Sequence, residues 1–282
     1  MSNVAIVTDS TSDMSRETTN RLKIKVVPLT VIFGEESFLD DGKEITTGEF
    51  YKKIRSAEKL PTTTQPTPKD FIEIYTEILK DSESIISIHI SKKMSGTINS
   101  TELAKKEMPG KDIEIVDSDL VSYPLGFIVV KAAKLALEGK TKEEILREVY
   151  NLKTKIKVLF VPSTLEYLKK GGRIGKAKGL IASLLEIKPI LTIHDGEVSQ
   201  FKTTRRWNQA KTELINSMET MVKNPQNLIV AVGDSDSKEE GAEMYERLKE
   251  TFNPKEISRF DIGAVVGTHL GPGGLCIAFY EE

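Results

Sequence analysis

The first half of the chain alternates short runs rich in valine and isoleucine with longer amphipathic stretches. This alternation is typical of a parallel sheet covered by helices, because parallel strands need a long crossover between them. We therefore expect an α/β fold with strands at Val4–Val7, Lys25–Phe33, Ser84–Ile90 and Ile113–Val116. The helical spacing of apolar residues predicts helices at Pro68–Lys80, Thr97–Glu107, Val121–Gly139 and Thr141–Thr154.

The second half has a different pattern. Two β-rich runs, Ile187–His194 and Glu197–Thr204, flank Asp195-Gly196, a pair that favours the tight turn of an antiparallel hairpin. We expect a second, α+β domain with a partly antiparallel sheet. The predicted division is an α/β domain at residues 1–157 and an α+β domain at residues 158–282.

Composition excludes several classes of protein. The 40 Lys and Arg residues nearly balance the 42 Asp and Glu residues, so the net charge of −2 provides no basic surface for nucleic acid. A single cysteine, Cys276, rules out an internal disulfide and fits a reducing compartment. We expect a cytoplasmic protein, since the first residues do not resemble a signal peptide and no run is long enough to cross a bilayer.

Two hydroxyl-rich segments each precede a predicted helix: Thr62–Pro68 and Ser91–Thr97. If both are turns at the same edge of one sheet, their hydroxyls and the helix-start N–H groups converge on a small anionic or polar headgroup. Gly96 would let a ligand oxygen approach the backbone amides. Helix capping alone is the alternative interpretation of both segments.

Two glycine-rich segments carry further candidates. Lys169–Lys176 lacks the glycine and hydroxyl positions of a nucleotide-binding P-loop, so Arg173 is left as a candidate for a transient phosphate or partner contact. Gly263–Gly274 holds five glycines around His269, which is either a site residue or an ordinary structural histidine. The chain has three scattered histidines with no helical pairing, so no metal site is expected.

Taken together, these segments resemble the DegV family of bacterial fatty-acid-binding proteins, the acyl-carrying partners of a fatty acid kinase. The resemblance rests on the order and spacing of six motifs across the whole chain: Val7-Thr8-Asp9-Ser10, Thr63-Thr64-Gln65-Pro66, Ser95-Gly96-Thr97, Asp117-Ser118, Gly171-Gly172-Arg173-Ile174 and Gly267-Thr268-His269-Leu270-Gly271-Pro272-Gly273.

The resemblance implies a non-catalytic carrier that binds one long-chain fatty acid, such as palmitate, in a tunnel between two domains. It implies that Thr63 and Ser95 hold the carboxyl group. His269 and Arg173 match positions near the carboxyl or on the surface that faces the kinase, whereas Thr62 falls at a variable position. It implies a role in lipid transport or fatty acid metabolism, with no cofactor other than the bound fatty acid.

Two other functions remain open from the sequence. The first is a serine hydrolase with Ser95 as nucleophile, His269 as base and Asp9 or Asp117 as the orienting acid, although Ser95 lacks the flanking glycines of a nucleophile elbow. The second is a kinase subunit that binds a small polyol through His269.

Overall fold

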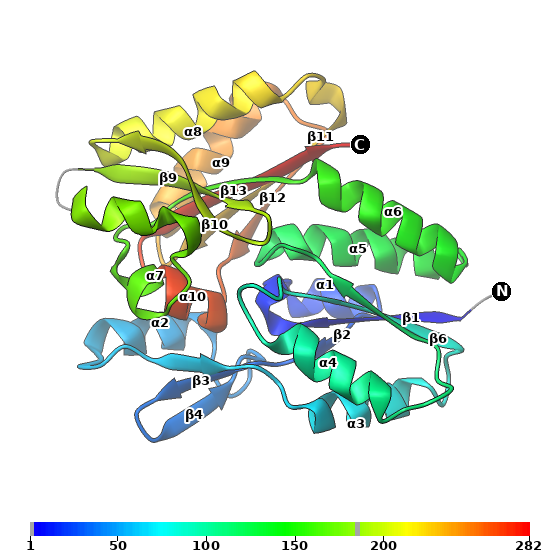
Figure 1. The fold of residues 1–282 in the computed structure, drawn as a ribbon. Helices are drawn as coiled ribbons and strands as arrows, with labels where there is room; N and C mark the ends of the chain where they lie inside the picture. The colour runs from blue at the N-terminus through cyan, green and yellow to red at the C-terminus, as the bar shows by residue number, and fades with distance from the viewer. Residues whose placement is uncertain (1–2, 184–186) are drawn as a thin grey trace.

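A parallel sheet forms the first layer of the computed structural model, which describes residues 3–183 and 187–282 (Figure 1). Its strand order is β2-β1-β6-β7. The two central strands are buried almost throughout because helices cover both faces. The strands are β1 (Val4–Asp9), β2 (Lys25–Val27), β6 (Ser84–His89) and β7 (Ile113–Asp117).

Helices α3 (Pro68–Ile78) and α4 (Thr97–Lys106) pack on one face of this sheet, and α5 (Tyr123–Leu137) packs on the other. Helix α6 (Lys142–Lys155) lies against α5, and the short α1 (Arg16–Arg21) follows the first strand. Capping boxes at Thr67 and Thr141 explain why α3 and α6 begin where they do.

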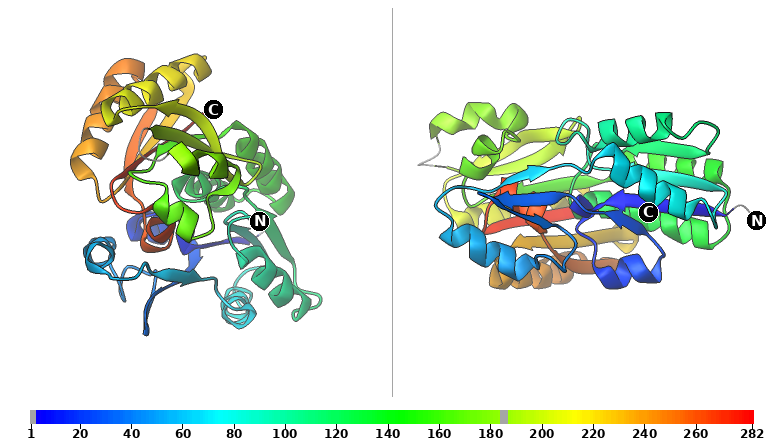
Figure 2. Two further views of the ribbon diagram at one scale, coloured as in Figure 1. Left: turned by 60° about the vertical axis from the view of Figure 1, so that its left-hand side comes forward. Right: turned by 90° about the horizontal axis from the view of Figure 1, so that it is seen from below.

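The second large sheet has the order β10-β9-β8-β13-β11-β12. Only β11 and β12 are parallel neighbours; the other pairs are antiparallel. Helices α8 (Trp207–Met221) and α9 (Lys238–Phe252) cover its outer face, as the turned view in Figure 2 also shows. The strands are β8 (Lys157–Val161), β9 (Lys188–His194), β10 (Glu197–Thr204), β11 (Leu228–Ser235), β12 (Glu256–Asp261) and β13 (Gly274–Glu281).

The inner face of the six-stranded sheet turns toward α5, so α5 lies between the two large sheets (Figure 1). One continuous apolar cluster joins residues of both sheets and of this helix. The remaining short elements on this side are α7 (Glu166–Lys170) and the 3-10 helices η1 (Ser10–Ser12) and η2 (Gly175–Ser183); η3 (Pro225–Asn227) precedes β11.

A small antiparallel sheet, in the order β4-β3-β5, forms a third layer with two helices. Its helices are α2 (Thr47–Ser56) and α10 (Ala264–Leu270), and its strands are β3 (Thr30–Phe33), β4 (Glu36–Leu39) and β5 (Thr62–Thr64). Gly267 makes close packing possible here, because a Cβ atom at that position would lie 2.5 Å from the hydroxyl of Tyr51. The small sheet therefore packs against a helix that lies more than 200 residues away in the sequence.

The predicted fold class is confirmed, and so is the hairpin. Asp195 and Gly196 both have positive φ (51° and 75°), as the expected turn requires. The single strand predicted at Lys25–Phe33 is wrong: Pro28 interrupts it, and its two parts join different sheets. The helix predicted from Val121 begins at Tyr123, with Pro124 in its first turn.

The predicted boundary between residues 157 and 158 stays a prediction. The six-stranded sheet takes its first strand from Lys157 onward. Helix α10, however, comes from the second half of the chain and packs on the small sheet of the first half.

Candidate functional site

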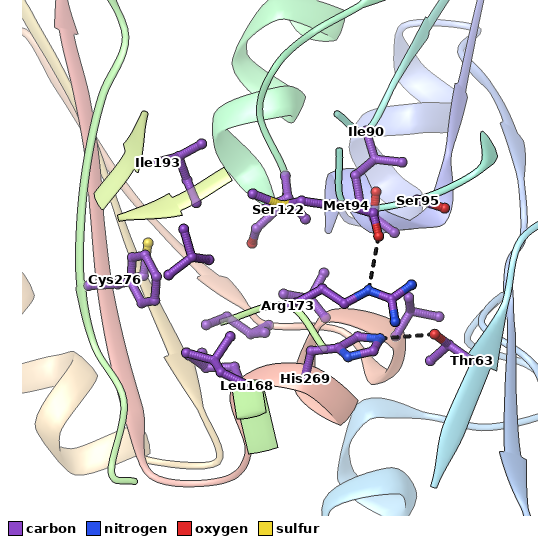
Figure 3. Close-up of a pocket in the computed structure, with 18 of the residues that line it drawn as sticks. Thr63, Ile90, Met94, Ser95, Ser122, Leu168, Arg173, Ile193, His269 and Cys276 are labelled. Carbon is purple, nitrogen blue, oxygen red and sulfur yellow. Dashed lines mark hydrogen bonds between the residues drawn. The ribbon is translucent and has the colours of Figure 1, made fainter. Parts of the chain in front are cut away.

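Thr63 lies on an edge strand, not in the turn expected from the sequence. Strand β5 pairs with β3, and Thr63 is opposite Val31. The alternation of a strand exposes Thr62 and Thr64 and turns Thr63 inward. Its hydroxyl lies 2.9 Å from Nε2 of His269 (Figure 3).

Ser95 lies in the loop between β6 and α4 and reaches the same cavity as Thr63. Its hydroxyl lies 2.9 Å from that of Thr97 and accepts a hydrogen bond from the Thr97 N–H at 3.3 Å. The two segments thus converge as expected, although they come from two different sheets rather than from one edge.

Gly96 is the N-cap residue of α4 and makes room for a neighbour. A Cβ atom at this position would lie 2.4 Å from the amide nitrogen of Gln65. The Gln65 side chain therefore fills the space over the glycine and joins the cavity wall. Gln65 carries no sequence signal beyond its place in the threonine motif, and sequence reasoning missed it.

His269 stands in the last turn of α10 and is largely buried. Burial lowers its pKa to about 4, and the nearby positive charge of Arg173 acts in the same direction. Its Nδ1 atom is buried and has no hydrogen-bond partner within the described part of the chain. A Cβ atom at Gly171 would lie 2.3 Å from Nδ1, so only glycine fits there beside the ring.

Arg173 connects the glycine-rich loop to the segment that carries Ser95. Its Nε donates to the carbonyl oxygen of Met94 at 3.0 Å, and Nη1 donates to the carbonyl of Gly171 at 2.7 Å. These two bonds fix a guanidinium group at the polar end of the cavity (Figure 3). A positive charge and three neutral polar side chains, those of Thr63, Ser95 and His269, therefore share one small region.

Two buried carboxyl groups hold the start of α10. Asp13 accepts a hydrogen bond from the Gly263 N–H at 3.1 Å and another from the Ser122 hydroxyl at 2.5 Å. Burial raises the pKa of Asp13 well above its usual value and that of Asp40 to about 6, and Asp40 faces the first amides of the same helix. These carboxyl groups fix the start of α10, and the contacts of His269 with Thr63 and Gly171 fix its end.

A cavity runs from this polar cluster into the apolar core. Its volume is about 100 Å³, counted as room for the centres of water molecules, whereas one buried water needs only about 10–15 Å³ of such room. Beyond the polar end the wall is mostly aliphatic. It comes from strands of the six-stranded sheet, from α7 and α10, and from the loops that follow β2, β6, β7 and β12. It includes Leu29, Ile90, Met94, Val121, Val158, Phe160, Leu168, Ile193, Val198, Ile262, Val265, Val266 and Leu270.

The hydroxyl residues along this wall do not make it polar. The hydroxyl of Thr11 donates to Asp9, and that of Ser122 donates to Asp13, so both are satisfied within the protein. Ser122 keeps this orientation with a backbone conformation that is unusual for a residue other than glycine (φ 63°, ψ −157°). The cavity thus offers hydrogen-bonding groups at one end and an apolar lining elsewhere.

The arrangement expected of a serine hydrolase is not assembled. His269 pairs with Thr63, and the Ser95 hydroxyl pairs with Thr97. Asp117 lies at the end of β7, where it accepts the N–H of Asp119 at 3.0 Å. No carboxylate therefore orients His269 among the hydrogen bonds of the described residues.

A hydrogen-bond network of Ser, His and Asp side chains does exist elsewhere, around Asp9. His89 Nδ1 lies 2.9 Å from Asp9, His89 Nε2 lies 2.6 Å from the Ser87 hydroxyl, and Tyr75 bonds the same hydroxyl at 2.7 Å. All four side chains are completely buried, so no substrate could reach Ser87. The network ties the ends of β1 and β6 together, so His89 has a structural role.

The described residues contain no helix long and apolar enough to cross a membrane. Fold and cavity together define a class: an α/β protein with a buried cavity that is polar at one end and apolar along the rest. Comparison with known proteins places it further. Residues 3–282 match the family described as "Uncharacterised protein, DegV family", and the chain belongs to that family.

Relatives match along nearly their whole length. A DegV domain-containing protein of Listeria innocua is 34% identical over 273 residues, 96% of each chain. Protein DegV of Bacillus subtilis is 32% identical over 280 residues, 98% of this chain and 99% of its own.

Solved structures of family members also superpose closely. A fatty-acid-binding DegV family protein from Thermus thermophilus has a TM-score of 0.93 at 34% identity and covers 99% of this chain and all of its own. DegV of Bacillus subtilis, described as a fatty acid binding protein, has a TM-score of 0.92 at 31% identity, with both chains fully covered. A stearic-acid-binding protein from Eubacterium ventriosum has a TM-score of 0.89 at 27% identity, covering all of this chain and 98% of its own.

Proposed function

We propose that this protein binds one long-chain fatty acid, such as palmitate, with its carboxyl group at Thr63 and Ser95 and its acyl chain in the apolar cavity. The observation that carries the proposal is the division of the cavity into a polar end and a long apolar remainder. The fatty acids bound by relatives with TM-scores of 0.89 to 0.93 support the same ligand class.

The acyl chain supplies most of the binding energy in this proposal. Each buried methylene contributes about 0.8 kcal/mol, so ~14 methylenes give on the order of 11 kcal/mol before ordering costs are subtracted. The carboxyl site can therefore be built mostly from neutral donors, the Thr63 and Ser95 hydroxyls, with Arg173 already engaged by two carbonyl groups.

The carrier would present its ligand to a separate fatty acid kinase and would not itself be the catalyst. A carboxylate oxygen of the ligand attacks the γ-phosphorus of ATP, and ADP leaves, giving an acyl phosphate without any proton transfer. Hydroxyl donors suit this step because they bind the carboxylate and leave one of its oxygens free to attack. Arg173 and His269 would face the incoming phosphoryl group, in a cytoplasmic role in lipid transport or fatty acid metabolism that requires no cofactor.

Extraction of the purified protein with organic solvent, followed by mass spectrometry, tests the binding of a fatty acid. The expected result is one equivalent of a fatty acid in the native protein and weaker retention by a Thr63→Val, Ser95→Ala double variant. A protein that neither contains nor takes up fatty acids would refute the proposal.

Incubation of the loaded protein with ATP and a purified fatty acid kinase subunit tests whether the bound fatty acid is presented for phosphorylation. Acyl phosphate should appear only when all three components are present. A loaded protein that hydrolyses nitrophenyl esters, with turnover abolished by Ser95→Ala, would instead establish the hydrolase.

A further inference from the structure

The end of the cavity opposite the polar cluster lies on the inner face of the six-stranded sheet. In Figure 3, Cys276 and Ile193 lie at the side farthest from Thr63. The Cys276 side chain lines the cavity and is 5% exposed. A linear ligand that starts at Thr63 and follows the cavity therefore runs toward β13.

Strand pairing shows which residues surround Cys276 on the sheet. Across the sheet, Cys276 is opposite Phe160 on β8 and opposite Gly233 on β11. Gly233 in turn pairs with Phe260 on β12. Residues directly opposite one another point to the same face, so a thiol and a glycine lie in one row between two phenylalanines.

The glycine in this row does not leave a second opening. A Cβ atom at Gly233 would lie 2.2 Å from the ring of Phe260, so that ring covers the glycine. On the other side, Phe160 stands beside the thiol in the cavity wall. Cys276 is thus the smallest side chain between two rings, with the backbone of β13 directly behind it.

Aromatic contacts close the region next to this row. Phe260 stacks on Tyr123 at 4.9 Å between ring centroids, and Tyr123 meets Phe127 edge-on at 5.3 Å. Phe127 in turn meets Tyr280, on the same face of β13 as Cys276, at 5.2 Å. These rings therefore close the side of the row that faces β12.

We infer that Cys276, set between Phe160 and Phe260, is the floor of the acyl cavity and that its size limits the length of the chain the protein accepts. The inference rests on the proposed function and adds a specificity-determining residue to it. The methyl end of the longest accepted chain lies against the Cys276 Sγ atom, and shorter chains leave that atom uncovered.

Because Cys276 is the only cysteine, its reactivity can be read directly from the mass of the intact protein. The protein is first stripped of lipid, then loaded with saturated fatty acids of 8 to 20 carbons, and the rate of Cys276 modification by methyl methanethiosulfonate is measured at pH 8.5. Short chains should bind without protecting the thiol. Protection should begin at one chain length and persist up to the longest chain that binds.

Size variants provide an independent measurement. Cys276→Leu adds two heavy atoms to the floor, so the preferred chain should shorten by about two carbons, and the longest chain should bind about fifteenfold more weakly, at about fourfold for each excluded methylene. Cys276→Ala removes the sulfur and should leave the longest chain bound at least as well. Ile277→Ala, on the opposite face of β13 in the other core, is the matched control and should leave the length preference unchanged.

Binding of all chains with equal protection, and unchanged length preference in both Cys276 variants, would overturn the inference and leave the proposed function intact. Failure of every chain to bind the wild-type protein would refute the proposed function and the inference with it. If Cys276→Leu does not fold, the chain-length preference is measured on Cys276→Ala instead, and circular dichroism checks that this variant is folded.

Discussion

The titration of His269 should make a destabilising contribution when the protein is acidified. The folded protein keeps this ring neutral down to a pKa of about 4, whereas the unfolded chain takes up a proton near 6.5. Between these two values the unfolded state binds more protons than the folded state, so stability falls as the pH is lowered. The contribution is fully present above pH 6.5.

The size of this effect follows from the gap between the two pKa values. At about 1.36 kcal/mol per pKa unit, the loss on going from pH 7.5 to pH 4 is about 3 kcal/mol. Asp13, whose pKa burial raises well above its usual value, acts in the opposite direction. So does Asp40, because burial raises its pKa from 3.8 to about 6. The folded state then binds the extra proton, and through Asp40 a fall from pH 7.5 to pH 4 raises the free energy of unfolding by about 2 kcal/mol.

The contributions of His269 and Asp40 can be separated by urea unfolding at pH 7.5 and pH 4 with three proteins. His269→Gln keeps a hydrogen-bond partner for Thr63 but cannot titrate, so it should gain about 3 kcal/mol relative to the wild type on acidification. Asp40→Asn should instead lose about 2 kcal/mol of unfolding free energy relative to the wild type when the pH is lowered from 7.5 to 4. If the free energies of unfolding of the wild type and His269→Gln change by the same amount between pH 7.5 and pH 4, the assignment of a buried, neutral imidazole is refuted.

Three further predictions concern the polar end of the cavity. Thr63→Val or Ser95→Ala should weaken fatty acid binding at least about tenfold in a fluorescent displacement assay, because each removes a hydrogen bond to a charged group; unchanged affinity would move the carboxyl elsewhere. Gly171→Ala should displace His269 and reduce affinity, whereas Gly179→Ala, which has open space around it, should not; equal effects would contradict the close contact. Binding of a carboxylate beside His269 should raise the pKa of its ring, so calorimetry in buffers of different ionisation heat should detect proton uptake below pH 6; buffer-independent heats would exclude this coupling.

Local patterns in the sequence determined much of the fold. The β-branched runs became the parallel strands, and Asp195-Gly196 became a turn with two positive φ angles. Thr67 and Asp70 form the capping box at the start of α3. These features depend on neighbours within a few residues, so one sequence contains the information needed to predict them.

The candidate site depended on contacts between distant segments, which the sequence does not encode locally. Thr62–Thr64 is too short and too polar to stand out as a strand, and only its pairing with β3 turns Thr63 toward the cavity. The glycine-rich segment around His269 gave no helical pattern, because Gly267 serves packing against Tyr51. The role of Gln65 beside Gly96 likewise appears only in three dimensions.

The cavity interrupts the largest apolar cluster of the molecule, and its wall joins strands of the six-stranded sheet to loops that follow strands of the parallel sheet. Any guest lodged there completes the interior, acting as a detachable portion of the protein's own hydrophobic packing. Resistance to heat and proteases should then rise with guest concentration, by thermodynamic linkage, and the lifetime of the polypeptide would follow the supply of its cargo.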